Sequence, residues 1–236
     1  LDADADNYGN VTTSQWACST PIGYVLDSTD CNDNNASINP GALDIPINGI
    51  DEDCSGLDAP LLPIVLGLYE FTGLGACPVV ANTVTTQPLN ALFSIFTNQG
   101  ASCSSTSNVF SGLSWNMAPT IDLTEFNEFT LTADSCKALN LYKFYFQHRT
   151  SSTGGTPTWA LRSSLDNFAT NVGTGLSGNN ANLMLSDTVV LPASFLGLQT
   201  VTFRIYLIGI ASNTATWRVD NVGLNGNVVN ATPSNF

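Results

Sequence analysis

The chain has 236 residues, and its 43% hydrophobic content is that of a globular protein and excludes a disordered one. Only 11% of the residues are charged, and the formal net charge of −13 excludes nucleic acid and anionic lipid as natural partners. Residues 1–60 contain eleven acidic residues and no Lys or Arg, so the charge is unevenly distributed. We therefore expect an acidic, loop-rich unit at residues 1–60 and a β-domain at residues 61–236.

The first ten residues, LDADADNYGN, place three aspartates at alternate positions. Positions 1, 3 and 5 of a turning loop direct oxygens to one side, and calcium takes about six to eight oxygen ligands. Asn7 tolerates the positive φ that position 6 requires, and Tyr8 at position 7 offers its backbone carbonyl. Thr13 replaces the usual bidentate Glu of position 12, so the missing ligand must come from elsewhere. The predicted carboxylate ligands of this loop are Asp2, Asp4 and Asp6.

Two more acidic clusters follow in the same unit. The second acidic cluster is DSTDCNDNN, with Asp30, Asn32 and Asp33. The third acidic cluster is NGIDEDCSGLD, with Asp51, Asp53, Ser55, Leu57 and Asp58. The third cluster repeats the spacing of positions 1, 3 and 5, with Gly56 at the turn. This repetition without any basic residue favours calcium, while the alternative is a solvated acidic tail.

Residues 2–58 resemble the MopE-type metal-binding motif of bacteria, which is similar in style to thrombospondin type 3 calcium repeats. The resemblance rests on DADADNYG and CSTPIGYVLDSTDCNDNNASINPGALDIPINGIDEDCSG, above all on INPGA at 38–42 and NGIDEDC at 48–54. It implies a compact, extracellular, calcium-stabilised loop unit and makes Cys31–Cys54 the expected disulfide. By position it assigns ligand roles to Asp2, Asp4, Asp6, Asp30, Asn32, Asp33, Asp51, Asp53 and Asp58.

The sequence departs from this motif at two points. Asn32 stands where the motif commonly has Asp, which removes the charge of one ligand. Pro46 and Ile47 stand where some members carry a cysteine, so Cys18 has no obvious local partner. The MopE label carries an association with copper, but residues 1–60 contain no His or Met. Oxygen ligands of this kind favour a hard cation, so we expect calcium rather than copper.

The chain has six cysteines, without a CxxC pair, and a single histidine, which argues against a zinc site of the Cys/His type. Six cysteines favour disulfides and an extracytoplasmic setting. No apolar run reaches the ~18 residues of a membrane span, so we expect no membrane insertion. The chain lacks a signal peptide and does not begin with Met, so we expect a processed part of a longer protein.

The second part reads as a series of β-strands. After the apolar entry LLPIVLGLYEF at Leu61, alternating segments recur at 128–133, 139–149, 158–164, 201–210 and 215–226. In the second of these, Tyr142, Phe144, Phe146 and His148 share one face of the expected strand. Turn clusters such as SSTGGTP and GLSGNN separate the segments, and no amphipathic helix is predicted. We therefore expect an all-β, jelly-roll-like antiparallel β-sandwich.

Residues 64–229 resemble domains of unknown function in secreted and cell-surface proteins of Bacteroidetes-like bacteria. The resemblance rests on FQHRTSSTGGTPTWALRSSLDNFATNVGTG and VTFRIYLIGIASNTATWRVDNVGLNG. It implies an extracellular location and a link to adhesin-like or carbohydrate-binding-like modules, without an assigned chemistry.

Catalytic residues are not evident. The chain has one histidine, His148, and no G-x-S-x-G elbow, and we expect His148 to be structural. Glu125 and Glu128 are close in sequence, as paired glycosidase acids can be, but we expect both to face water. We predict no catalytic residues, and a hydrolase with carboxylate chemistry is the third alternative for the whole chain.

Sugar binding is more plausible than catalysis. Trp115, Tyr145, Trp159 and Trp217 are candidates for a flat stacking platform, with Arg162 or Arg218 nearby. The alternative is that Trp159 and Trp217 face the core, which their alternating strands favour.

The sequence thus predicts a non-enzymatic, extracellular, calcium-binding structural or adhesive module of a bacterial surface protein. One form of it is the repeating subunit of a surface filament, in which neighbours join by strand addition. The expected partners are other copies of the chain or neighbouring domains of a longer protein, and glycans. The second alternative is a carbohydrate-binding module of a larger secreted enzyme.

Overall fold

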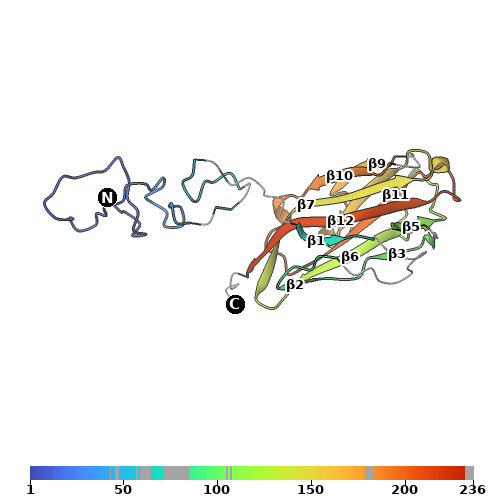
Figure 1. Cartoon of the computed structure of the whole chain (residues 1–236), viewed down its shortest axis with the longest axis horizontal. Helices are drawn as coiled ribbons and strands as arrows, with labels where there is room; N and C mark the ends of the chain where they lie inside the picture. The colour runs from blue at the N-terminus through green and yellow to red at the C-terminus, as the bar shows by residue number, and fades with distance from the viewer. Residues whose placement is uncertain are drawn as a thin grey trace. The chain divides into compact units, whose positions relative to one another are not determined.

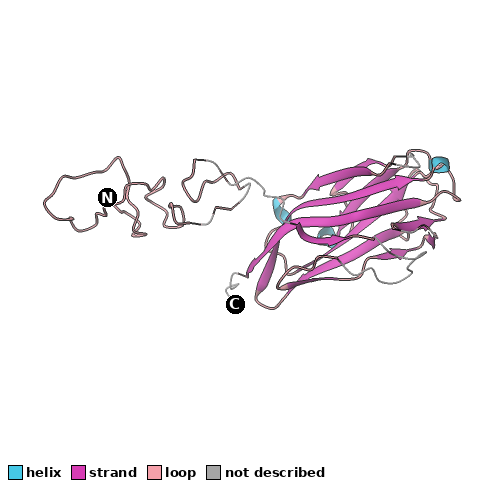
Figure 2. Ribbon diagram, viewed as in Figure 1, coloured by secondary structure: helices cyan, strands magenta, loops and turns pink. Residues whose placement is uncertain are grey.

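The computed structural model describes residues 1–42, 44–45, 48–56, 58, 65–71, 85–104, 106, 108–178 and 183–231. It divides into two compact units, Leu1–Leu62 and Pro63–Phe236. The described residues of the first unit form turns and loops, and all strands belong to the second unit (Figures 1 and 2). Nothing helical in the described part of the chain has the length and hydropathy of a membrane span.

The second unit consists of strands joined by turns and three short 3-10 helices. The strands are β1 (Val65–Tyr69), β2 (Ala91–Phe93), β3 (Thr97–Gln99), β4 (Ser102–Cys103), β5 (Phe110–Leu113), β6 (Phe126–Ala133), β7 (Lys137–Thr150), β8 (Thr158–Ser163), β9 (Gly173–Leu176), β10 (Leu185–Val190), β11 (Thr200–Ile208) and β12 (Trp217–Asn230). The 3-10 helices are η1 (Ser152–Gly154), η2 (Ser164–Asp166) and η3 (Ala193–Phe195).

The strands form two antiparallel sheets of six strands each (Figure 2). The first sheet has the order β10-β7-β12-β5-β4, and β1 also pairs with β12. The second sheet has the order β2-β6-β11-β8-β9, and β3 also pairs with β6. The prediction of an all-β, jelly-roll-like antiparallel sandwich is confirmed.

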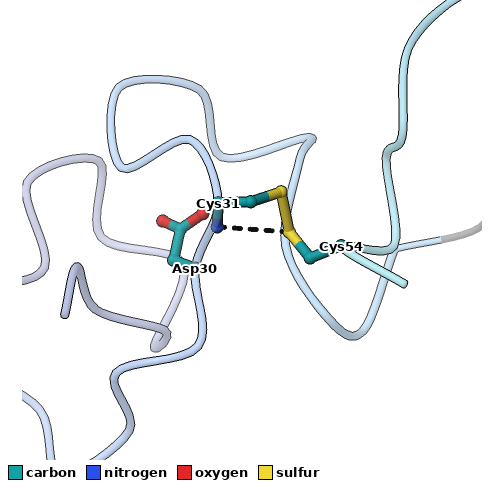
Figure 3. A group of neighbouring side chains, drawn as sticks. All are labelled: Asp30, Cys31 and Cys54. Carbon is teal, nitrogen blue, oxygen red and sulfur yellow. Dashed lines mark hydrogen bonds between the residues drawn. A yellow bond between two sulfur atoms is a disulfide. The ribbon is translucent and has the colours of Figure 1, made fainter. Parts of the chain in front are cut away.

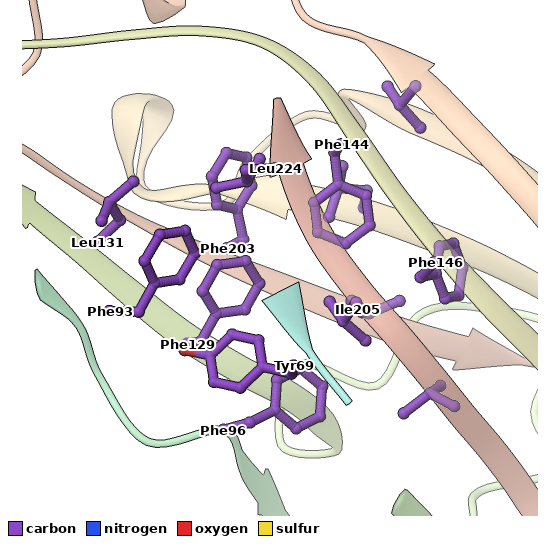
Figure 4. Packing of buried hydrophobic residues seen from close by; sticks show 14 of the residues in the cluster. Tyr69, Phe93, Phe96, Phe129, Leu131, Phe144, Phe146, Phe203, Ile205 and Leu224 are labelled. Carbon is purple, nitrogen blue, oxygen red and sulfur yellow. The ribbon is translucent and has the colours of Figure 1, made fainter. Parts of the chain in front are cut away.

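An aromatic core lies between the two sheets (Figure 4). Phe129 and Phe203 come from the second sheet, and Phe144 comes from the first. The ring centroid of Phe144 lies 6.2 Å from that of Phe129 and 5.7 Å from that of Phe203. Such aromatic pairs are worth roughly 0.5–1.5 kcal/mol each beyond the area they bury, so these rings hold the two sheets together.

The register of β7 against β12 corrects one expectation about the inner face. Phe144, Phe146 and His148 are buried on the same face of β7, as predicted, but Tyr142 is only half-buried. The pairing shifts by one residue between Asn225 and Gly226, and this bulge directs Leu141 inward instead of its neighbour. Tyr142 is the extra, unpaired residue of β7, and strict alternation along β7 cannot reveal such an insertion in the pairing.

The outer face of the second sheet carries a stacked arginine. The guanidinium carbon of Arg204 on β11 lies 4.0 Å from the ring centroid of Phe126 and 3.8 Å from that of Phe168. Its Nε also donates to Glu128 Oε2 at 2.6 Å. Phe168 belongs to the loop that follows η2, so the stack fixes this loop to the sheet.

Replacing this arginine should therefore loosen the loop. We expect Arg204→Gln to lower the free energy of unfolding by about 1–3 kcal/mol, the combined value of two cation–π contacts and a partly exposed ion pair. Urea denaturation measures this loss, and Lys137→Gln is the control because it removes the same charge from an exposed side chain bonded to Asn230. Equal stability of both variants would contradict a structural role for the stack.

Candidate metal centre

The first unit lacks a hydrophobic core. Among the described residues of Leu1–Leu62, Ile38 is the only buried hydrophobic side chain, while Trp16, Ile22 and Leu26 are fully exposed. Units this small that bury little apolar surface need disulfides or metal ions to fold. The stability of this unit must therefore come from other interactions.

The first loop curls around its own aspartates. Asp2 Oδ1 accepts from the backbone N–H of Ala5 at 2.8 Å, and Asp6 Oδ1 accepts from that of Tyr8 at 2.8 Å. Asn7 adopts a φ of 79°, as predicted for the turn position. Ligand oxygens of Asp2, Asp4 and Asp6 consequently lie within 4.8 Å of one another.

The second acidic cluster is held against this loop by backbone contacts. The N–H of Asp30 donates to Gly9 O at 3.1 Å, and the N–H of Ala3 donates to Asp33 Oδ1 at 2.9 Å. Gly9 permits the approach, because a Cβ at this position would lie 2.8 Å from Asp27 O. The structure thus brings carboxylates from residues 30 and 33 to the loop that lacks its position-12 ligand.

The aspartates of the first loop together with Asp30 and Asp33 form one group of carboxylates, called the first cluster below. Asp4, Asp30 and Asp33 form its centre. One oxygen of each lies within 4.8 Å of the others, and Asp30 and Asp33 are 6% and 5% exposed. Both oxygens of Asp4, Oδ2 of Asp6 and Oδ2 of Asp30 are buried and have no hydrogen-bond partner among the described residues. Buried carboxylate oxygens without donors are costly unless a cation compensates them.

The electrostatics of Asp4 reflect this crowding. Burial, followed by the charges of Asp6 and Asp30, raises the pKa of Asp4 above its ordinary value. Like charges this close destabilise one another, and a divalent cation reverses the sign of the local field. The cluster therefore has the charge and the donor type of a site for a hard cation.

The disulfide between Cys31 and Cys54, implied by the family resemblance, is confirmed (Figure 3). The N–H of Cys31 also donates to Cys54 Sγ at 3.2 Å. Asp30 lies beside the pair, but sulfur atoms in a disulfide are not thiolates and offer no soft ligand. The crosslink ties the second acidic cluster to the third.

A second carboxylate group lies in the third cluster, where oxygens of Asp44, Asp51 and Asp53 lie within 4.8 Å of one another. Asp51 accepts from the N–H groups of Ser55 at 2.9 Å and Gly56 at 2.8 Å. These bonds close the predicted loop, although they also satisfy the Asp51 oxygens without a cation.

The remaining predicted ligands are placed as follows. The N–H of Asn32 donates to Asp30 Oδ1 at 2.7 Å, and the N–H of Tyr8 donates to Asp6 Oδ1, so both residues adjoin the first cluster. Asp58 Oδ2 accepts from the N–H of Gly49 at 2.6 Å and closes the third loop. Leu57 lies outside the described residues.

Sequence reasoning missed Asp44 and Glu52. Glu52 is 7% exposed, and its Oε2 accepts from the N–H of Ile45 at 2.9 Å. Its own N–H donates to Asp44 Oδ1 at 3.0 Å. Burial acts to raise the pKa of Glu52, but the donors of Ile45 and Asn48 lower it overall, so the carboxylate stays charged. Neither acid belongs to the 1-3-5 pattern, and no sequence spacing marks them.

The other cysteines are partly accounted for. Cys103 is disulfide-bonded, whereas Cys18 and Cys136 are exposed free thiols, and Cys77 lies outside the described residues. The sequence offers Cys18 no obvious local disulfide partner, and in the structure its thiol is free.

The candidate sugar platform in the sandwich is not formed by tryptophans. Trp115, Trp159 and Trp217 are 1%, 2% and 1% exposed, so their faces are not available to a ligand. All three belong to the core, which the alternating strands predict for Trp159 and Trp217 but not for Trp115. Arg162 on β8 and Arg218 on β12 belong to different sheets, so they do not flank a common site.

A buried polar network surrounds the single histidine. Trp217 Nε1 donates to Ser177 Oγ at 3.2 Å, and Ser177 Oγ lies 3.1 Å from His148 Nδ1. His148 Nε2 lies 2.9 Å from Asp187 Oδ2, which also accepts from Trp159 Nε1 at 2.8 Å. These residues have the types of a hydrolase triad, but Ser177 and His148 are 0% exposed, so a substrate cannot reach the hydroxyl. The network is structural, and every polar atom named here has a partner.

Three solved structures illustrate what the chain is similar to. The K1 cleaved adhesin domain of Lys-gingipain from Porphyromonas gingivalis W83 is 16% identical, with a TM-score of 0.35 over 59% of this chain and 92% of that chain. A family 29 carbohydrate-binding module from Piromyces equi is 14% identical, with a TM-score of 0.34 over 58% and 93%. The mannohexaose-bound CBM27-1 of Caldicellulosiruptor saccharolyticus is 10% identical, with a TM-score of 0.34 over 70% and 97%.

Among curated proteins, none matches the chain at a significant level. One family model matches, described as "Cu-binding_MopE: Putative metal-binding motif", and it covers residues 30–59. The matched segment contains Asp30, Asp33, the Cys31–Cys54 disulfide and the Asp44–Asp51–Asp53 group, but not the first loop. The match to this family model thus falls on the segment that carries the disulfide and the second carboxylate group.

Proposed function

We propose that the first unit binds calcium and that the chain is a non-enzymatic, extracellular structural or adhesive module of a bacterial surface protein. The observation that carries the metal assignment is the set of buried, unpartnered oxygens of Asp4, Asp6 and Asp30. These oxygens form no well-aligned hydrogen bond with the described residues, although the backbone N–H of Asp6 acts on Asp4, so a cation is the natural partner.

Calcium fits this donor set better than other metals do. The first cluster offers only oxygen atoms, from Asp2, Asp4, Asp6, Asp30 and Asp33. Copper and zinc favour nitrogen and sulfur ligands, and magnesium prefers to keep several waters in a strict octahedron. Calcium accepts many carboxylates in irregular geometry, which suits ligands that come from two separate loops. Backbone and side-chain oxygens of Tyr8 and Asn32 are further candidates.

The acids of the sandwich support a non-enzymatic role. Glu125 Oε2 accepts from the N–H of Asn116 at 2.6 Å, and Glu128 pairs with Arg204. Both carboxylates are thus engaged in structural contacts rather than held together as an acid and a nucleophile. In this proposal the calcium unit connects the sandwich to a neighbouring domain or to another copy.

Calcium titration of the full chain by calorimetry tests the metal assignment. We expect Asp30→Asn to weaken calcium binding by about tenfold or more, because it removes a charged ligand from a buried position. Asp27→Asn is the matched control, since Asp27 is exposed, lies three residues away and accepts from the neighbouring residues Thr29 and Ser28. Absence of calcium binding, or equal binding by both variants, would contradict the proposal.

A further inference from the structure

A cavity of about 300 Å³ lies on the outer face of the first sheet, away from the aromatic core. The strands β7 and β10 form its floor, and β1 and the bulge of β12 lie beside them. The lining residues that carry the argument are Leu68, Tyr145, Gln147, Ser186, Asp187 and Asn221.

Tyr145 provides an aromatic surface in this cavity. It pairs with Gly223 of β12, and a Cβ on that glycine would lie 2.4 Å from both Cζ and Oη of the tyrosine. The end of the ring therefore lies over the glycine, across the sheet surface, instead of projecting into solvent. Leu68 pairs with the same glycine from the other side, so an apolar strip crosses the cavity.

Neutral hydrogen-bonding groups surround the aromatic strip. Asn221 Nδ2 donates to Gln147 Oε1 at 2.9 Å, and Gln147 Nε2 reaches Ser186 Oγ at 3.4 Å. Each amide still has donor and acceptor capacity for a ligand. Asn221 stands at the bulge between Asp220 and Gly223 with a φ of 47°, and this backbone turn places its amide beside Gln147.

The charge around the cavity disfavours an anion. None of the six Lys and Arg residues of the chain lines it. The carboxylate of Glu70 is close enough to act on both Tyr145 and Asp220. Oδ2 of Asp187 is bonded to both His148 and Trp159, so this oxygen is already satisfied by neutral donors.

We propose that this cavity binds one unit of a neutral oligosaccharide, with the sugar ring stacked on Tyr145 and its hydroxyls bonded to Gln147 and Asn221. A pyranose combines an apolar C–H face with a rim of hydroxyls, which matches an aromatic strip bordered by amides and hydroxyls. The inference rests on the adhesive role proposed above and gives that role a site and a class of ligand.

Calorimetry on the full, calcium-loaded chain tests the inference. The probes are hexasaccharides of β-1,4-linked glucose, mannose and xylose, with hexagalacturonate as the acidic counterpart. We expect binding of at least one neutral probe and a loss of about tenfold or more in Tyr145→Ala, which removes the stacking surface. Asn221→Gly should weaken binding several-fold, and it keeps the left-handed backbone that this position requires.

Tyr142→Ala is the matched control, because Tyr142 lies on the same strand, outside the lining, with its hydroxyl bonded to Asn227. Thermal melts establish that all variants fold. Failure of every neutral probe, binding of hexagalacturonate alone, or unchanged binding by Tyr145→Ala would overturn the inference. Calcium binding measured on the same samples separates the two proposals: calcium without sugar refutes only the cavity, and sugar without calcium refutes only the metal site.

Discussion

Chelation of calcium with EDTA is expected to destabilise the Leu1–Leu62 unit, residues 1–30 above all, and to leave the β-sandwich unchanged. The unit buries one hydrophobic side chain among its described residues, so the cation supplies what a core would otherwise supply. A ligand present at a thousand times its Kd stabilises the folded state by about 4 kcal/mol, which is a large fraction of the stability of a small unit. Without it, the carboxylates of Asp4, Asp30 and Asp33 repel one another at short range.

The disulfide makes the expected unfolding uneven. Cys31 and Cys54 close a loop with a sequence separation of 23, which is worth about 3 kcal/mol by chain entropy. Residues 1–30 lie outside that loop and depend on the first carboxylate cluster. Limited proteolysis in EDTA should therefore cut residues 1–30 first, and residues 31–54 should become sensitive only after reduction.

Calorimetry provides the second measurement of the same effect. We expect two melting transitions with calcium, of which only the transition of the acidic unit moves to lower temperature in EDTA. Magnesium added in excess over EDTA is the control for a general charge-screening effect. Identical melting curves and identical cleavage patterns with and without EDTA would show that the carboxylates are stable without a cation.

The sequence predicted part of this centre because part of it is local. The spacing of Asp2, Asp4 and Asp6 and the turn at Asn7 depend on a few neighbouring residues, and the loop has the expected geometry. Glu52 could not be found in this way, because its role depends on donors seven residues away that become neighbours only after folding. Whether the predicted residues bind calcium remains the prediction that the titration addresses.

The sandwich shows the same division between local and non-local features. Alternation predicts that Phe144 and Phe146 share one face of their strand, and both are buried on one face, because a strand with one buried face repeats every two residues. The cavity at Tyr145 depends on a glycine in another strand and on a bulge, and neither is visible from β7 alone. Residue type alone singles out Tyr145, but the three tryptophans grouped with it are core residues.

Lowering the pH from 7.5 to 5 is expected to destabilise the sandwich through His148. Burial lowers the pKa of His148 below its ordinary value, although the hydrogen bond and the charge of Asp187 act to raise it. The folded protein therefore holds a neutral imidazole, whose Nδ1 accepts from Ser177 and whose Nε2 donates to Asp187. The unfolded chain takes up a proton near pH 6.5, so this contribution is complete above about 6.5 and is lost as the pH falls below it.

A substitution separates this effect from other titrations. His148→Leu keeps the volume similar but leaves the buried Ser177 hydroxyl without its acceptor and Asp187 without one of its two donors. We expect a loss of about 2–5 kcal/mol at pH 7.5, since an unsatisfied buried polar group costs about 1–3 kcal/mol. Urea denaturation at pH 5, 6 and 7.5 measures both quantities, with calcium present throughout.

The single histidine makes the comparison decisive, because no other side chain in this sequence has an ordinary pKa between 5 and 7.5. The variant should start less stable and should lose little more as the pH falls, so the two stability curves converge toward pH 5. A parallel pH dependence in both proteins would mean that His148 does not titrate in this range. In that case the network would hold a charged imidazole, and the pairing of His148 with Asp187 would be an ion pair instead of a neutral hydrogen bond.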